Sequence, residues 1–485
     1  MMSSRPSDVG APRCSSPPSP AIRERAAGRW PVLLGLVLVL SAGLLGCTSA
    51  SETTAPVAPP DTFSAAGAQE VPDRWWTVFD SDRLNALVDT ATAQNFTLRT
   101  AWQRLQAAEA VVDREGGALY PDLEASGRAE RRGGTEEAFA VGGSYEIGLS
   151  SAYEVDLWGR IRDRVEAEQF RAEATRADYQ AAALSVSAEV VRTWALLAEA
   201  RNQRRLVEDQ IETNVAVLEL LQNRLETGQI RGPDVLRQRQ LVESTREQRA
   251  AVESRVQTLE HQLAVLLGRS PQAGVDAPPD SLPALPPLPE TGVPTDLVRR
   301  RPDVQSAFRL LKAADRDLAA AISDQYPRIT LLASGSTIAE SATALFENWA
   351  YSFAGNLLAP IFRGGELRAE VDRTEAVRTQ RLYEYGQTIL TAFQEVEDAL
   401  VREQQQRVQI QRLEEQVDLA RQAYRQLRVQ YLNGTTDYLD VLTALDEVQQ
   451  LRRDLLSAEL TLVLDRIALY RALAGSFETD REREN

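Results

Sequence analysis

Few side chains in this sequence could perform chemistry. The 485 residues include one histidine, His261, and two cysteines, Cys14 and Cys47. A Cys/His zinc site cannot be built from this inventory, a disulfide framework is excluded, and a Ser-His-Asp triad would have to use His261. That histidine lies between Leu259 and Leu263, where we expect a helix-surface or interface residue. The sequence therefore predicts no catalytic residues, no cofactor and no metal site.

The charge of the chain limits the kinds of partner it could bind. It carries 70 acidic and 54 basic residues, a net charge of −16. Neutralising the phosphates of a nucleic acid requires a basic face. We therefore expect no nucleic-acid partner.

Cys47 is the residue whose surroundings favour a specific modification. It closely follows a 15-residue apolar run, 31–45, which is preceded by Arg23, Arg25 and Arg29. The run is shorter than the ~20 residues of a membrane-spanning helix, and positive charge before a short apolar core is typical of a signal peptide. Leu44-Leu45-Gly46-Cys47 resembles the lipobox of bacterial lipoproteins, whose cysteine is acylated and becomes the new N-terminus. The alternative is an uncleaved short anchor.

Cleavage and acylation would define the start of the mature chain. Removing residues 1–46 leaves 49 basic and 68 acidic residues, a net charge of −19. In lipoproteins of this kind an aspartate after the cysteine favours inner-membrane retention, so Thr48 implies the outer membrane. Residues 47–72 are rich in Ser, Thr, Ala and Pro and predict a flexible tether behind the acylated Cys47.

The rest of the chain consists of two copies of one plan, offset by 206 residues. Tyr120-Pro121 recurs as Tyr326-Pro327, and Asp234-Val235-Leu236 recurs as Asp440-Val441-Leu442. Each copy, 73–270 and 297–475, predicts a helix, a β-hairpin, a very long helix, a glycine-containing turn and a return helix. A Pro-rich linker, 271–296, separates the copies, and its proline density excludes helix and sheet. A polar tail, 476–485, follows the second copy.

Alternating residues predict the hairpins, at 119–158 and 326–363. One face of the first hairpin carries Tyr145, Ile147, Leu149, Tyr153, Val155 and Leu157, and period two with one apolar face indicates a strand. The opposite face offers three candidate lumen residues, Glu146, Glu154 and Asp156, although an ordinary solvated face would show the same pattern. Membrane barrels need at least eight strands, so four per chain would require an oligomer. A soluble sandwich is the alternative.

Heptad-like spacing predicts the helices, at 161–226, 234–268, 367–432 and 438–474. The second long helix carries Leu413, Val417, Ala420, Tyr424, Leu427 and Tyr431, spaced as in a coiled-coil seam. The long segments contain no proline and one glycine, Gly386. At ~1.5 Å per residue each would extend about 100 Å.

Several short motifs, in order along the chain, carry a family resemblance. They are Trp75-Trp76-x-x-Phe79, Tyr153-Glu154-Val155-Asp156-Leu157-Trp158-Gly159-Arg160, Arg301-Pro302-Asp303-Val304, Tyr326-Pro327-Arg328-Ile329 and Pro360-Ile361-Phe362-Arg363-Gly364-Gly365. With the repeat, they make the chain resemble the TolC family of outer-membrane efflux channels, in its lipoprotein (NodT/OprM-like) branch. The resemblance implies a mainly α fold with a β-barrel part. A homotrimer would form a 12-stranded outer-membrane barrel that continues into a periplasmic α-helical coiled-coil barrel.

The same resemblance implies partners and a docking surface. A periplasmic adaptor protein and an inner-membrane transporter would complete a tripartite pump, and the helix turns would face them, with glycine allowing close backbone approach. The adaptor-docking candidates at the turns are Leu225, Gly228, Val235, Leu236, Tyr431, Gly434, Val441 and Leu442.

The resemblance also implies a gate at the turns. Asp440 matches an aspartate lining the closed periplasmic entrance of family members, and Asp234 is its repeat equivalent. Thr443 stands where some members carry a second gate acid. The alternative is that Asp234 and Asp440 are N-caps of the return helices, and both roles can coexist.

The expected function is a passive conduit that carries small toxic compounds out of the cell. Within the channel class, the alternative is the outlet of a protein-secretion (type I-like) system. A lipid-anchored periplasmic coiled-coil scaffold would explain the helices but not the alternating aromatic strands. A secreted hydrolase would need a nucleophile–base constellation, which the sequence does not offer.

Overall fold

The computed structural model describes residues 56–58, 60–68, 70–132, 142–275 and 281–483. The signal segment 1–46 and Cys47 therefore lie outside the described residues. Everything described belongs to one compact unit of the chain, Ala55–Asn485.

Both repeats place their elements in the same order. The first contains α3 (Phe96–Gly116), β1 (Glu124–Arg132), β2 (Gly142–Val155), α4 (Arg160–Glu226) and α5 (Gly232–Leu266). The second contains α7 (Pro302–Ser323), β3 (Arg328–Ala339), β4 (Ala350–Leu358), α8 (Glu366–Leu432) and α9 (Tyr438–Leu473). α4 and α8 are each 67 residues long. Each begins after a glycine with positive φ, Gly159 or Gly365.

Shorter elements lie before and between the repeats and at the C-terminal end. The 3₁₀ helix η2 (Trp75–Phe79) and α2 (Asp82–Gln94) precede α3, and α6 (Pro294–Arg300) precedes α7. Two further 3₁₀ turns, Gly117–Leu119 and Ala342–Ala344, flank the strands, and α10 spans Asp480–Arg483. α6 and α7 are separate helices because Arg301, which precedes Pro302, is extended with ψ 124°.

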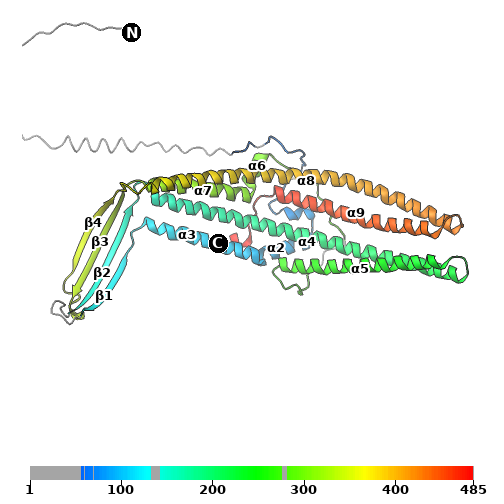
Figure 1. Ribbon diagram of the computed structural model, residues 1–485, viewed down its shortest axis with the longest axis horizontal. Coiled ribbons are helices and arrows are strands. Elements are labelled where there is room, and N and C mark those ends of the chain that lie inside the picture. The colour runs from blue at the N-terminus through cyan, green and yellow to red at the C-terminus, as the bar shows by residue number, and fades with distance from the viewer. Residues whose placement is uncertain (1–55, 59, 69, 133–141, 276–280, 484–485) are drawn as a thin grey trace, which may run out of the picture. The chain divides into compact units, whose positions relative to one another are not determined.

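The four strands form one antiparallel sheet in the order β1-β2-β3-β4 (Figure 1). Strands β2 and β3 come from different repeats, so the sheet joins the two copies. Within the described residues, neither β1 nor β4 has another strand along its outer edge.

The register of this sheet separates polar from apolar side chains. Ser150, Ser334 and Ser352 lie opposite one another in neighbouring strands, and the hydroxyls of Ser334 and Ser352 are 2.8 Å apart. On the other face, Leu149, Gly335 and Tyr351 form one row and Val155, Ile329 and Leu357 another. Tyr351 and Phe353 are each 81% exposed. The sheet therefore carries a broad apolar face that the described part of the chain leaves uncovered.

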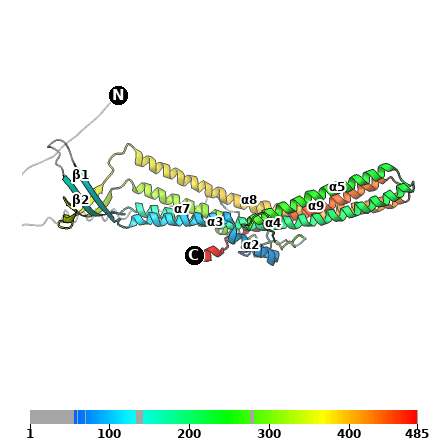
Figure 2. The same cartoon turned by 90° about the horizontal axis from the view of Figure 1, so that it is seen from below.

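The long helices pack in pairs. α5 lies against α4, α9 lies against α8, and α4 also contacts α9. Figure 2 shows the α4–α5 and α8–α9 turns together at the end away from the sheet. Among the described helices, α4 contains an 18-residue stretch of mean hydropathy 1.3, but 67% of that stretch is buried inside the protein. This apolar stretch therefore belongs to the protein core.

The main core lies midway along α4 and α8. Trp75 and Trp76 of η2 are buried there, Trp75 stacked on Tyr470 of α9 with ring centroids 6.2 Å apart. Trp76 makes an edge contact with Phe477 at 4.9 Å. The tryptophan motif thus joins the segment before the first repeat to α9 and the C-terminal segment.

Two expectations about the connecting segments, on the linker and on the tether, are wrong. The linker expected over 271–296 ends earlier, because Pro294 occupies the first turn of α6, where its missing N–H costs no hydrogen bond. The described part of the tether, residues 56–58, 60–68 and 70–72, is docked, with Phe63 and Val71 buried. The polar tail is docked as well, through Phe477 and Thr479, whose hydroxyl lies 2.8 Å from that of Tyr179.

Candidate functional site

The two helix turns share one backbone geometry. After α4, the N–H of Gly228 donates to Leu225 O and that of Gln229 to Arg224 O. After α8, Gly434 and Thr435 donate to Tyr431 O and Gln430 O. Gly228 and Gly434 have φ of 71° and 73°, the left-handed conformation that ends helices in this motif. An added Cβ would meet nothing of this chain within 4 Å at either glycine, so within the chain itself the glycines provide the left-handed φ.

A small apolar core holds the two turns together. It consists of Leu221, Val235, Tyr438 and Val441, with Leu218, Tyr431 and Leu442 packed against it. Val235 and Val441 are 8% and 6% exposed. They therefore stabilise the turns instead of facing a partner, whereas Leu225 and Leu236 are exposed.

Two further contacts connect the turns of the different repeats. Arg231 and Asp437, both exposed, form an ion pair of 3.5 Å. Arg224 lies over the ring of Tyr431, 5.5 Å from its centroid, and burial raises the pKa of the Tyr431 hydroxyl. The turns therefore form one joined tip, which we call the helix tip (residues 221–236 and 427–443).

A buried polar network lies directly behind the helix tip. The Tyr438 hydroxyl donates to Gln238 Oε1 at 2.5 Å, and Gln238 Nε2 donates to Asn214 O at 2.7 Å. Asn214 and Gln449 exchange side-chain hydrogen bonds of 2.8 and 3.2 Å. Burial raises the pKa of Tyr438 far above its ordinary value, so this hydroxyl stays protonated and remains a donor. The network connects α4, α5 and α9 through buried polar groups, whose hydrogen-bond partners are other protein groups.

The sequence itself contains a signal for this network. Asn214 interrupts an otherwise apolar seam, Val207, Ile211, Leu218 and Leu221. A single polar residue in a coiled-coil seam commonly fixes register through a buried partner. The partners Gln238, Gln449 and Tyr438 could not be assigned without the packing of α5 and α9 on α4.

The gate candidates take different positions at the tip. Asp234 is 8% exposed and lies 3.7 Å from Arg237, whereas Asp440 is exposed and accepts a hydrogen bond of 2.5 Å from Thr436. Thr443 is exposed and donates to Leu439 O. The N-caps are Arg231 and Asp437, so the N-cap interpretation of Asp234 and Asp440 is wrong. Both aspartates lie in the first turn of a return helix, where a carboxylate interacts favourably with the helix dipole.

A groove of about 400 Å³ runs between the two return helices. Its walls are Arg237, Gln240, Leu241 and Ser244 of α5 and Leu439, Leu442, Thr443 and Asp446 of α9. Leu442 and Thr443 were sequence candidates, and the other residues of this return-helix groove were not.

The three lumen candidates separate into two groups. Glu146 lies within β2, opposite Arg128 of β1. Glu154 is at the end of β2 and pairs with Arg160 at 2.7 Å. Asp156 follows the strand and accepts N–H bonds from Ile161 and Arg162 at the start of α4. Burial raises the pKa of Asp156, but these bonds and the Arg162 guanidinium outweigh it and lower the pKa overall.

No cluster of three or more His, Cys, Asp and Glu side chains that could hold a metal ion occurs in the described part of the chain.

The chain is similar to proteins of known role along most of its length. It is 31% identical over 465 residues to the pyoverdine export outer membrane protein OpmQ of Pseudomonas aeruginosa, covering 91% of this chain and 96% of that protein. It is 27% identical over 453 residues to the cation efflux system protein CusC of Escherichia coli, covering 91% and 98%.

Solved structures agree with these similarities. The outer-membrane channel OprN superposes with a TM-score of 0.79 at 29% identity, covering 87% of this chain and 99% of that one. CusC superposes with a TM-score of 0.80 at 27% identity, covering 89% and 100%. These neighbours are outer-membrane channels, which confirms the mainly α fold with a β-barrel part.

The sequence also matches the outer membrane efflux protein family in two segments, residues 87–269 and 293–475. The segments coincide with the two structural repeats, and the family consists of efflux channels and not of enzymes. The chain therefore belongs to the outer membrane efflux protein family and is an outer-membrane component of an efflux pump.

Proposed function

We propose that the protein is the outer-membrane conduit of a tripartite pump and that it works as a homotrimer with a periplasmic adaptor and an inner-membrane transporter. Small toxic compounds or drugs would pass through it to the exterior. The names of its relatives refer to pyoverdine, toluene and cations as cargo. Because that cargo differs so widely, we assign the choice of substrate to the inner-membrane transporter.

The observation that carries this proposal is the incomplete sheet. The described residues form four strands with an exposed aromatic face and two open edges. These are too few for a membrane barrel, which needs at least eight. Three copies would supply twelve strands and pair β1 of one copy with β4 of the next. The apolar face, with Tyr351 and Phe353, would then meet lipid, and the face with Ser334 and Ser352 would line an aqueous lumen.

A second exposed surface fits the same assembly. Tyr383, Leu390, Val401, Val408 and Leu419 of α8 are between 46% and 66% exposed. At about 100° per residue they fall within roughly 20° of one line along the helix. α8 follows β4 in the chain, and we assign this apolar stripe to the contact with the neighbouring copy.

In the proposed assembly the acylated Cys47 anchors each copy to outer-membrane lipid. Attachment through this residue requires more than one acyl chain, since one chain binds a membrane only marginally. Mass spectrometry of the mature N-terminus tests the modification directly.

Asp440 is proposed to ring the periplasmic entrance and to favour cations. Asp440→Asn should reduce the preference for cations over anions, because three carboxylates would lose their charge at the narrowest point. Thr443→Asp, on the same helix face, should increase that preference. Reversal potentials of single channels in asymmetric KCl measure both effects. Unchanged selectivity in both variants would exclude Asp440 and Thr443 from the entrance.

The turns at Gly228 and Gly434 are proposed to receive the adaptor. Asparagine tolerates the left-handed backbone that these positions need, so Gly228→Asn with Gly434→Asn adds bulk without breaking the turns. We expect the double variant to abolish drug export at normal channel abundance. Gly365→Asn, with φ of 90° at the start of α8, is the matched control and should export normally. Reduced abundance of the double variant would instead assign the turns to folding.

A further inference from the structure

Gly386 is the only glycine in the two 67-residue helices, and the N-terminal segment crosses α8 there. A Cβ on Gly386 would lie 2.6 Å from Pro56 Cγ and 3.6 Å from Val57 Cγ2. Such Cβ contacts below 3.0 Å essentially never occur, so with the Pro56 ring in place any side chain at this position would displace the segment. Glycine destabilises the interior of a helix. The close contact with Pro56 explains why this position nevertheless carries no side chain.

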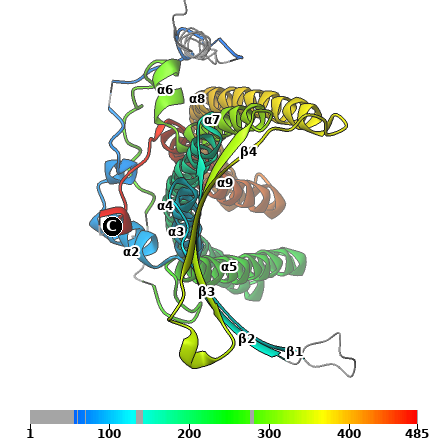
Figure 3. The same cartoon turned by 90° about the vertical axis from the view of Figure 1, so that its left-hand side faces the viewer.

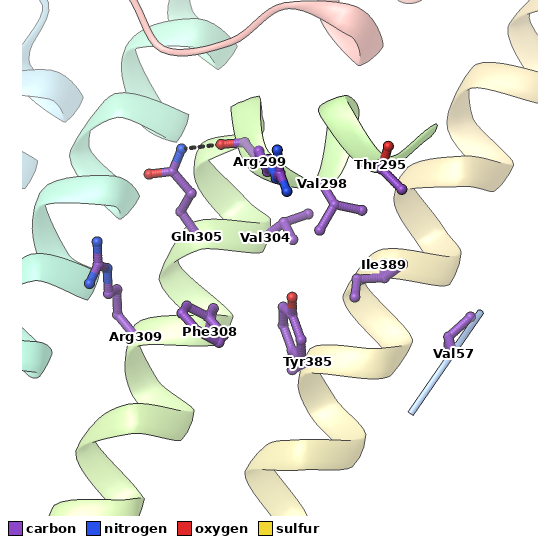
Figure 4. A pocket seen from close by; sticks show the side chains of 10 residues that line it. All are labelled: Val57, Thr295, Val298, Arg299, Val304, Gln305, Phe308, Arg309, Tyr385 and Ile389. Atoms are coloured by element: carbon purple, nitrogen blue, oxygen red, sulfur yellow. Dashed lines mark hydrogen bonds between the residues drawn. The ribbon is translucent and has the colours of Figure 1, made fainter. Parts of the chain in front are cut away.

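The contacts of this segment continue along α8. Val57 lines a cavity of about 590 Å³ with Tyr385 and Ile389, and Figure 4 shows the three side chains around it. Phe63 makes an edge contact with Phe393 at 6.2 Å, and the N–H of Ser64 donates to Glu397 Oε1 at 2.9 Å. Successive residues of the segment therefore meet successive positions of α8, so its upstream end points toward the sheet.

The downstream end of the segment is held by the linker between the repeats. The N–H of Gly67 donates to Pro289 O at 2.9 Å, and an added Cβ on Gly67 would lie 1.8 Å from Leu288 O. The described residues of this segment, 56–58 and 60–67, are thus held at both ends. We call them the N-terminal brace. Figure 3 shows this segment, α6 and the C-terminal segment along one side of the long helices.

The first repeat holds the other terminus at the equivalent place. Subtracting 206 from Phe308, Tyr385 and Gly386 gives Trp102, Tyr179 and Gln180. The rings of Phe308 and Tyr385 are 5.5 Å apart and those of Trp102 and Tyr179 are 5.2 Å apart. The C-terminal segment crosses there, with Gln180 donating to Glu482 at 3.2 Å. The two repeats therefore differ at this position. The first has Gln180, and the second has Gly386, which leaves room for Pro56.

The position of the brace limits how far the lipid anchor can reach. Nine residue steps separate Cys47 from Pro56, which is at most about 30 Å of extended chain. Gly386 is twenty residues from the start of α8 at Glu366, which is about 30 Å of helix. Ile361 and Phe362 are exposed just before that start. In the proposed assembly they are suited to the periplasmic surface of the outer membrane. The two lengths match.

We propose that Gly386 is the seat of the N-terminal brace and that the chain from Cys47 to Pro56 is just long enough for the seated chain to reach the membrane. The chain from Cys47 to Pro56 would thus act as a strap of fixed length, which holds the periplasmic rim of the barrel at the membrane surface. The seat stands on the contacts above, whereas the strap rests on the proposed outer-membrane function and on acylation of Cys47.

A disulfide between residues 56 and 386 tests the seat. The Cβ built on Gly386 is 3.7 Å from Pro56 Cβ, within the range that disulfides require. Pro56→Cys with Gly386→Cys should therefore crosslink in isolated membranes under mild oxidation. Pro56→Cys with Gln180→Cys, at the repeat-equivalent position, is the control and should not. Absence of the 56–386 crosslink would overturn the seat.

Shortening the strap tests its length. Deleting residues 49–52 from the crosslinking variant should reduce the 56–386 crosslink to the level of the control pair. Adding Cys47→Ala and a signal peptide for unlipidated export should restore it, because the chain is then released from the membrane. A crosslink that survives the deletion in the acylated protein would overturn the length limit. Mass spectrometry that finds no lipid on Cys47 would refute the anchor while leaving the seat to be judged by the crosslink.

Discussion

Arg466→Leu is expected to destabilise the protein by about 3–5 kcal/mol, because it leaves a buried carboxylate without its buried partner. Arg466 is fully buried on α9 and makes two hydrogen bonds to Glu403 of α8, at 2.7 and 2.5 Å. The Glu403 side chain is 5% exposed. The same guanidinium donates to the carbonyl oxygens of Pro286 and Pro287. One side chain therefore fixes α8, α9 and the linker between the repeats.

Two variants separate the ion pair from simple packing. Glu403→Leu with Arg466→Leu should lose much less stability than Arg466→Leu alone, since a buried pair can be replaced by apolar groups at little cost. Arg407→Ala should have a small effect, because that guanidinium is half exposed although it also pairs with Glu403, at 3.1 Å. Apparent Tm values from circular dichroism in detergent measure all three. Equal losses in the single and double leucine variants would contradict the account.

The Glu403 pair also predicts a dependence of stability on pH. Burial raises the pKa of the carboxyl, but the Arg466 and Arg407 guanidinium groups outweigh burial and lower the pKa below its ordinary 4.5. The pair therefore stabilises the fold fully above pH 4.5, and this stabilisation is lost as the pH falls through the lowered pKa. The drop in Tm on acidification should be smaller in the double leucine variant.

Phe353→Arg is expected to prevent assembly in the outer membrane, whereas Ser352→Arg is expected to assemble. The two residues are neighbours in β4 and lie on opposite faces of the sheet. An arginine facing lipid costs about 2–4 kcal/mol at the bilayer midplane, and three copies would multiply that cost. An arginine facing the lumen stays hydrated and should only reduce conductance.

Fractionation and native electrophoresis of the two variants give the readout. Phe353→Leu, which keeps the apolar face, is the control for loss of the aromatic ring. If Phe353→Arg assembled as well as Ser352→Arg, the aromatic face would not meet lipid and the barrel would have to be reconsidered.

The long helices and the strands could be predicted from local pattern. The segment expected over 161–226 is helical from Arg160 to Glu226, because it has a seam and lacks proline and glycine. The strands could be predicted because apolar and polar residues alternate strictly along them. Displacing a strand by one residue would exchange its two faces, so the alternation also assigns each side chain to a face. The number of copies could not be worked out from four strands, and only the family resemblance implied three.

The docked termini and the interior of the tip could not be predicted in this way. Phe63 and Phe477 are single aromatic residues in polar segments, and they are buried by helices more than 300 residues away in sequence. No periodicity marks such a contact. Val235 and Val441 could not be told from Leu225 and Leu236 as docking residues, because the packing between the two repeats decides which of them are buried.

The central claim is that the face of the sheet with Ser334 and Ser352 lines an aqueous passage. The most direct test is the single-channel conductance of the purified Ser352→Cys protein in planar lipid bilayers, before and after addition of a charged, membrane-impermeant thiol reagent. We predict discrete channels whose conductance falls in steps on modification, whereas Phe353→Cys channels do not respond. Absence of channels, or a response at Phe353→Cys and none at Ser352→Cys, would contradict the account.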